Sequence, residues 1–252
     1  MSKFNFMKFK ILLLIIIATC TINAQTSPLE ADRPDQTETP SIVPKGMFQA
    51  ESGFSFEKVA TKNAVFTLPS TLWKYGISQK IELRLITEWI LEQSENQKQN
   101  GLLPIAVGFK VNLLEEKGWL PKTSLISHIS LKNTASKNFK YDYYVPDFRF
   151  TMQHHLSEKM TFGYNIGAAW DGFNKQSTGI YTLTTGYAIT EKVGAYIEVF
   201  GFAPQNETAY HNFDGGFTYL INDNFMVDLS SGLGITQTAP QYYLALGISF
   251  RI

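Results

Sequence analysis

Ile81-Glu-Leu-Arg-Leu-Ile-Thr-Glu-Trp89 is the stretch that decides the fold, because its side chains alternate in character with a period of two. One face carries Ile81, Leu83, Leu85, Thr87 and Trp89, and the other carries Glu82, Arg84, Ile86 and Glu88. Successive side chains of a β-strand point to opposite faces of the sheet. The stretch is therefore predicted to be a strand with one apolar face and one largely polar face.

The same alternation recurs along most of the chain. It is clear in residues 105–113, 162–170 and 242–252, and no comparable helical period of 3.6 accompanies it. Strands are expected near residues 46–57, 64–76, 81–90, 103–114, 122–132, 143–156, 160–171, 178–189, 193–202, 210–220, 225–234 and 241–252. These are twelve strands, and the pattern predicts an all-β domain over residues 45–252.

A repeated turn sequence separates pairs of these strands. Tyr75–Lys80, His154–Lys159, Tyr187–Lys192 and Tyr219–Asn224 share one form, in which a ring, any residue and Ile or Leu precede three polar residues. Such short polar breaks are typical of tight hairpin turns. Four hairpins are therefore expected on one rim of the sheet, with mostly longer connections on the other.

The apolar face must be kept from water, and three folds could do this: a secreted sandwich, a soluble lipocalin-like barrel, and a barrel in lipid. Strands of about ten residues with short turns on one rim and longer loops on the other are typical of outer-membrane barrels. Rings also gather at the strand ends, where they suit the bilayer interface. These include Tyr75, Tyr187 and Tyr219 near the turns and Trp89, Tyr143 and Trp170 near the loops. We therefore expect a closed antiparallel transmembrane β-barrel of about 12 strands, within a range of 10 to 14, in contact with the lipid bilayer.

The first residues have the form of an export signal. Lys3, Lys8 and Lys10 precede the apolar run 11–18, and a small residue, Ala24, comes before Gln25. This order predicts a secretory signal peptide over residues 1–24, cleaved after Ala24. A lipoprotein signal ending at Cys20 is the alternative. Export combined with a lipid-facing barrel predicts the outer membrane of a Gram-negative cell.

Residues 25–44 have a different composition from the rest. They contain four prolines, and their four acids face one arginine, which gives a charge of −3. Four prolines exclude both a helix and a central strand, so an extended N-terminal arm is expected. The inward glycines of the barrel leave room in the lumen, and we hypothesise that the arm around Asp32 and Arg33 occupies that room as a plug.

Overall charge and cysteine content exclude several classes of function. Lys and Arg together number 22, as do Asp and Glu, so no basic surface is available for a nucleic acid. The single cysteine excludes a Cys-rich zinc site and an iron–sulfur cluster. No cofactor and no metal site are expected.

The polar faces of the strands supply the candidate site. Ionisable residues predicted to line the lumen are Glu82, Arg84, Glu88, Lys110, Asp147, Arg149, Glu198, Asp214, Asp228 and Arg251. They could filter solutes by charge along a conduction path. They could equally pair across strands as structural ladders, which mixed signs favour.

The last strand carries a further candidate signal. Gly247-Ile-Ser-Phe-Arg-Ile252 places a glycine before large apolar residues at the third-last and last positions. Gly247, Phe250 and Ile252 thus resemble the C-terminal signal that the outer-membrane assembly machinery reads, although the commonest form ends in an aromatic residue. An ordinary closing strand would show the same alternation.

A family resemblance emerges from the arm and the first two strands. Ala31-Asp-Arg-Pro-Asp-Gln-Thr-Glu-Thr-Pro40, Ile42–Gly46 and the strand Phe48–Phe56 resemble the opening of the meta-pathway phenol-degradation family of outer-membrane proteins, often labelled transporters. Leu68–Leu72 followed by Tyr75-Gly-Ile77 is similar to its second strand. The resemblance covers most of residues 31–252. It implies a β-barrel that passes small, aromatic or hydrophobic solutes, and it implies no catalytic residue.

Three functions therefore remain in view. The first is a passive channel or transporter for small solutes, which is not an enzyme. The second is a structural or assembly-partner barrel with a filled lumen and no flux. The third is a lipid hydrolase, since His128 and Ser130 share one strand face at the spacing of a base and a nucleophile. His128 falls on the predicted inner face, whereas an enzyme acting on lipid needs its dyad outside.

Overall fold

The structure, a computed structural model, describes residues 27–252, so the predicted signal peptide and its cleavage point lie outside the described residues. Thirteen β-strands make up most of the described chain. They are β1 (Phe48–Ala60), β2 (Asn63–Gly76), β3 (Ile81–Gln93), β4 (Lys98–Leu102), β5 (Ala106–Leu114), β6 (Lys122–Ser130), β7 (Val145–His155), β8 (Met160–Trp170), β9 (Ser177–Ala188), β10 (Val193–Pro204), β11 (Tyr210–Asn222), β12 (Phe225–Gly234) and β13 (Tyr242–Arg251). A single turn of 3-10 helix, η2 (Lys137–Phe139), lies between β6 and β7.

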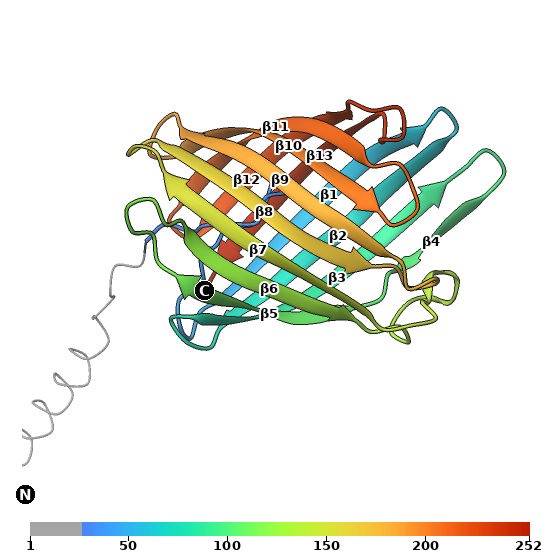
Figure 1. The fold of residues 1–252 in the computed structure, drawn as a ribbon, viewed down its shortest axis with the longest axis horizontal. Coiled ribbons are helices and arrows are strands. Elements are labelled where there is room, and N and C mark those ends of the chain that lie inside the picture. Colours follow the sequence, from blue (N-terminus) through green and yellow to red (C-terminus); the bar gives the residue numbers. More distant parts are fainter. Residues whose placement is uncertain (1–26) are drawn as a thin grey trace, which may run out of the picture.

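Twelve of these strands close into an antiparallel barrel (Figure 1). The sheet order runs from β2 through β1 and β13 back to β5 and β3, and β2 also pairs with β3. Closure matters because a closed sheet leaves no edge of unpaired N–H and C=O groups in hydrocarbon. The predicted closed barrel of about twelve strands is confirmed.

The alternation places side chains as predicted. Leu83 and Ile248 on the outer face are 49% and 40% exposed, whereas Glu82 and Lys110 on the inner face are fully buried. The barrel therefore has an apolar exterior and a charged interior. This is the reverse of a soluble barrel, which buries its apolar face.

The two rims differ in the way the repeats predict. The four repeated sequences form the tight turns β2–β3, β7–β8, β9–β10 and β11–β12, and these turns share one rim with the C-terminus. We call this end the turn rim and the opposite end the loop rim. Among residues 27–252, no helix is long and apolar enough to cross a membrane.

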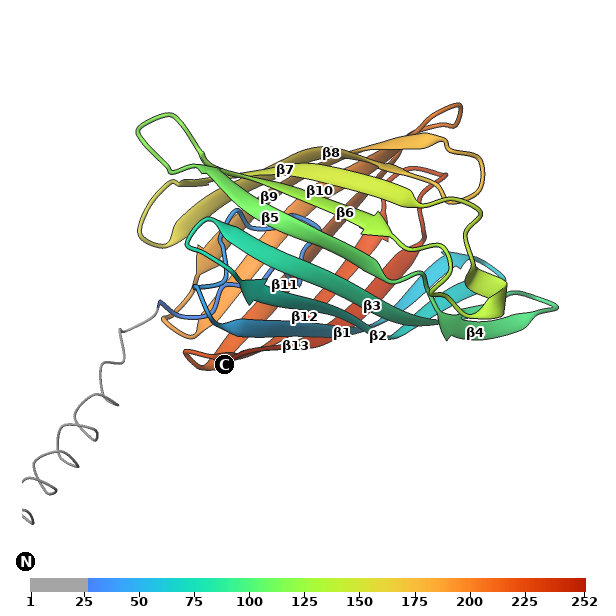
Figure 2. The ribbon, with the colours of Figure 1, turned by 90° about the horizontal axis from the view of Figure 1, so that it is seen from below.

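One connection differs from the prediction. Residues 91–102 are expected to be a loop, but β3 continues to Gln93 and pairs with β4 through Trp89↔Leu102 to Gln93↔Lys98. The segment is rich in Gln, Asn, Lys and Glu, so it lacks the apolar alternation that marks the other strands. This segment forms a polar hairpin that extends the loop rim, and β4 is not one of the twelve strands that close the barrel (Figure 2).

Candidate functional site

The arm, residues 27–44 of the described chain, enters and leaves the barrel at the turn rim. Near its start, Leu29 N donates to Asp223 O at 2.8 Å, and at its end Gly46 N donates to Gly76 O at 2.8 Å. Between these points the arm runs inside the barrel (Figure 2). It is therefore a loop inserted into the lumen from one end.

The prolines explain how the arm is held. An extended segment that cannot join the sheet must satisfy its backbone groups elsewhere. Wall side chains provide the partners: Glu51 accepts from Asp32 N at 2.9 Å, Glu82 accepts from Val43 N at 2.9 Å, and Ser124 Oγ donates to Pro40 O at 2.6 Å. Side chains of the inner wall therefore hydrogen-bond the backbone of the arm at several positions along its length.

Asp32 is the centre of a buried ion cluster. Its carboxylate lies 3.0 Å from Lys74 Nζ, 3.0 Å from Arg84 Nη1 and 2.8 Å from Lys110 Nζ. All three cations are at most 1% exposed in their side chains. Such charges are costly to bury unless they are paired, so removing Asp32 would leave three cations short of a partner.

Glu38 extends the same cluster along the wall. Its carboxylate pairs with Arg84 Nη2 and lies 3.8 Å from Arg149 Nη1 on β7. Its backbone N–H donates to Asn165 Oδ1 on β8 at 2.8 Å. Two acids of the arm therefore meet the cations of β2, β3, β5 and β7.

Arg33 meets the opposite charge on another part of the wall. Its Nη2 lies 2.9 Å from Asp228 Oδ1 on β12. The guanidinium lies over Gly53 of β1 and Gly247 of β13, where any Cβ atom would overlap it. The arm is thus complementary in charge and in shape to the wall around it.

The tip of the arm crosses toward β9 and β10. Gln36 N donates to Glu198 Oε2 at 2.7 Å, and Thr37 Oγ1 donates to the other oxygen of Glu198. Thr37 Oγ1 also lies 2.6 Å from Thr182 Oγ1. Together with Arg33, these contacts fix both ends of the segment 33–36, which we call the crossing segment.

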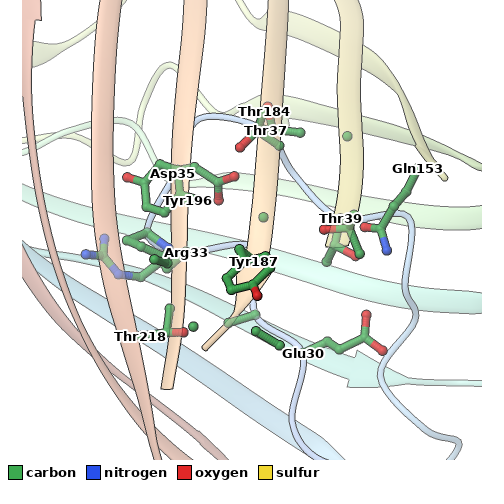
Figure 3. Close-up of a pocket in the computed structure, with 18 of the residues that line it drawn as sticks. Glu30, Arg33, Asp35, Thr37, Thr39, Gln153, Thr184, Tyr187, Tyr196 and Thr218 are labelled. Carbon is green, nitrogen blue, oxygen red and sulfur yellow. The ribbon is translucent and has the colours of Figure 1, made fainter. Parts of the chain in front are cut away.

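The crossing segment separates two cavities. A turn-side cavity of about 470 Å³ lies between the arm and β7–β11 (Figure 3). A loop-side cavity of about 340 Å³ lies toward the loop rim. Arg33 and Pro34 line both cavities, Asp35 lines only the first, and Gln36 lines only the second. The crossing segment therefore forms the partition between them.

Comparison with known proteins agrees with this architecture. Residues 31–252 match the family model described as "Putative MetA-pathway of phenol degradation". The chain belongs to this family. No curated protein sequence matches it.

Solved structures share the fold of this family member at low sequence identity. The COG4313 outer membrane channel from Pseudomonas putida F1 has a TM-score of 0.67 and 12% identity, over 87% of this chain and 99% of that one. The NanC porin has a TM-score of 0.55 and 8% identity, over 81% and 100%. The translocator domain of the autotransporter NalP from Neisseria meningitidis has a TM-score of 0.50 and 9% identity, over 83% and 90%. These likenesses show that the chain has the fold of outer-membrane β-barrels.

The predicted lumen residues fall into three groups in the structure of this family member. Glu82, Arg84, Lys110, Arg149, Glu198 and Asp228 contact the arm. Glu88, Asp147 and Asp214 have wall partners, which are Ser70, His128 and Tyr243. Arg251 lies at the turn rim, where it donates to Asn224 Oδ1 and to Ser27 O at the start of the arm. The structure thus brings most of them together around the arm.

The residues of the candidate assembly signal have distinct surroundings. Gly247 lies beneath Arg33, the Phe250 ring lies 6.3 Å from the Phe48 ring, and Ile252 is 74% exposed. Contact with Arg33 gives Gly247 a packing reason to be glycine. Recognition of these residues by the assembly machinery stays a prediction.

Two wall residues of the site escape the sequence reading. Lys74 pairs with Asp32 and with Glu51, and Glu51 also binds the arm backbone. Both lie on the inner face of their strands. In the β1–β2 register, Lys74 lies opposite Gln49 and Glu51 lies opposite Leu72. The alternation of β1 and β2 could have identified them as inward charges, because Glu51 follows the same period as Gly53.

The arrangement around His128 does not favour hydrolysis. Its Nε2 accepts from Arg84 Nε at 3.1 Å, and its Nδ1 lies 3.1 Å from Asp147 Oδ1. Both ring nitrogens are engaged away from Ser130, whereas a general base needs one nitrogen at its nucleophile. His128 is also buried on the inner face.

Proposed function

We propose that the chain is a passive channel for small, aromatic or hydrophobic solutes, and that the arm controls passage as a plug. The observation that carries the proposal is the crossing segment, which divides two lumen cavities and is tied to the wall at both ends. The family description names phenol degradation, and one structure with the same fold is described as an outer-membrane channel. Both descriptions support a small-solute role.

The distribution of charge supports a removable plug. Cations on β2, β3, β5 and β7 face acids on β10–β12 across the lumen, and three residues of the arm, Asp32, Glu38 and Arg33, meet partners of opposite charge there. When the arm leaves, lumen water can solvate these charges, so the displacement exposes no charge to hydrocarbon. A displaced arm would then leave a polar conduit.

A structural barrel without flux is the second candidate. The density of contacts favours it, since Asp32 alone pairs with three buried cations. In that case the arm would fill the lumen permanently and no solute would pass.

Liposome swelling separates the two candidates. The mature chain is reconstituted and challenged with phenol, benzyl alcohol and small sugars, beside a variant that lacks residues 27–44. The channel proposal expects solute entry with the complete chain and faster entry without the arm. Entry of no solute with either protein would overturn it, and equal rates with both would overturn the plug.

A further inference from the structure

Aromatic side chains of the barrel line one side of the loop-side cavity. Its lining includes Phe200 and Phe202 of β10, Tyr210 of β11 and Tyr243 of β13. The rings of Phe202 and Tyr210 lie 5.2 Å apart, and those of Phe200 and Phe202 lie 5.9 Å apart at 87°. A cavity of about 340 Å³ is at the small end of the range for ligand pockets, which begins at about 300 Å³.

A carboxylate lines the same cavity without a partner. Glu57 of β1 lies opposite Tyr243 in the β1–β13 register. Within residues 27–252, the Glu57 side chain makes no hydrogen bond and no ion pair. Glu51 and Glu82, on neighbouring parts of the inner wall, are both tied to buried cations. Glu57 is therefore available to a ligand.

The neighbouring charges favour a cationic ligand. Arg33 is the one cation among the described lining residues of this cavity, and its guanidinium is already paired with Asp228. Two acids are bonded to residues that line the cavity: Glu198 accepts from the backbone N–H of Gln36, and Asp214 accepts from the Tyr243 hydroxyl. An anion entering the cavity would meet this acidic side of the lumen.

Aromatic rings and an unpaired carboxylate together define one ligand chemistry. Ring faces attract cations, and a carboxylate pairs with an ammonium group. We propose that the loop-side cavity binds a small organic cation, an ammonium group on an aromatic or alkyl body, with Glu57 as its charge partner. The proposal rests on the proposed function only in placing this site on the path of a solute.

Calorimetry on the purified full-length mature chain in detergent tests the site. The probes are phenethylamine, its neutral isostere 2-phenylethanol and the anion 3-phenylpropanoate. Phenethylamine is expected to bind at least tenfold more tightly than either. Glu57→Gln is expected to abolish that preference and to leave 2-phenylethanol binding within about twofold.

Two further variants keep the test decisive. Phe202→Leu retains apolar volume but removes a ring, and is expected to weaken phenethylamine binding several-fold. Glu95→Gln removes an exposed carboxylate of the loop rim and is expected to change nothing. Heat-modified migration on gels verifies that each barrel has folded. Equal binding of phenethylamine and 2-phenylethanol to the unmodified chain would overturn the proposal, as would an unchanged preference in both Glu57→Gln and Phe202→Leu.

The outcomes also separate this site from the channel proposal, because calorimetry requires no flux. Tight phenethylamine binding by a protein that passes no solute supports the site and contradicts the channel. Solute entry without any preference for the amine overturns the site alone.

Discussion

Arg33 of the arm and Asp228 of β12 lie 2.9 Å apart, and the guanidinium of Arg33 fits over the wall because Gly53 and Gly247 leave space beneath it. The pair joins residues 195 positions apart in the chain. It ties one end of the crossing segment, which separates the two cavities, to the wall.

Filling the space under Arg33 should displace the crossing segment. Gly53→Leu places a branched side chain where the guanidinium lies, and the arm must shift because the β1 backbone is held on both sides by β2 and β13. We expect more frequent or longer openings in planar-bilayer recordings. Gly179→Ala is the control, since a Cβ there meets only Ala203 at ordinary contact distance. Recordings of Gly53→Leu that match those of the control would contradict the prediction.

Removing the charge of Asp32 should release the arm while leaving the barrel intact. Asp32→Asn leaves Lys74, Arg84 and Lys110 with one negative partner fewer, and breaking a buried pair costs about 3–5 kcal/mol. That cost falls on arm docking, so protease should cleave residues 27–44 at least tenfold faster than in the unmodified chain.

An exposed pair provides the comparison for Asp32→Asn. Lys62 and Glu95 form an ion pair on the loop rim with side chains 60% and 57% exposed, and exposed pairs contribute about 0–1 kcal/mol. Glu95→Gln should leave cleavage of the arm unchanged. If Asp32→Asn is no more sensitive than Glu95→Gln, the ion cluster does not hold the arm.

A loop outside the barrel offers a prediction about pH. Asp171, just after β8, accepts from the backbone N–H groups of Phe173, Asn174 and Gln176. The hydrogen bond from Asn174 is the main cause that lowers the Asp171 pKa below its ordinary value. Because the folded pKa is lowered, the carboxylate stabilises the loop at neutral pH, and this contribution is lost as the pH falls through the lowered value.

Hydrogen exchange measures that contribution. Protection of the Phe173, Asn174 and Gln176 amides should fall in Asp171→Ala at neutral pH and should fall in the unmodified chain only in strong acid. Asp142→Ala, in the neighbouring loop, is the control. Unchanged protection in Asp171→Ala would show that the carboxylate does not order the loop.

The barrel could be predicted from sequence because its signal is local. Alternation from Ile81 to Trp89 and the four repeated turns each span fewer than ten residues, and the pairing of neighbouring strands follows from them. Sequence does not predict the β4 hairpin, because its polar residues carry no such period. Local pattern predicts strands only where lipid or a packed face imposes an alternation.

The position of the arm depends on contacts that no local pattern contains. Asp32 meets Lys110, 78 positions away, and Gln36 meets Glu198, 162 positions away. Sequence shows an acidic, proline-rich segment and a set of inward charges, which supports a plug as a hypothesis. It does not show which acid meets which cation, because that depends on the depth of the arm in the lumen.

The central claim is that the arm must move for solute to pass, and a reversible cross-link tests it most directly. Thr37 Oγ1 and Thr182 Oγ1 lie 2.6 Å apart, and residues 25–252 contain no cysteine. In planar bilayers, the double variant Thr37→Cys, Thr182→Cys should show no openings when oxidised and should recover the openings of the unmodified chain after reduction. Thr37→Cys alone should be indifferent to reductant. The same conductance in the oxidised and reduced double variant would contradict the account.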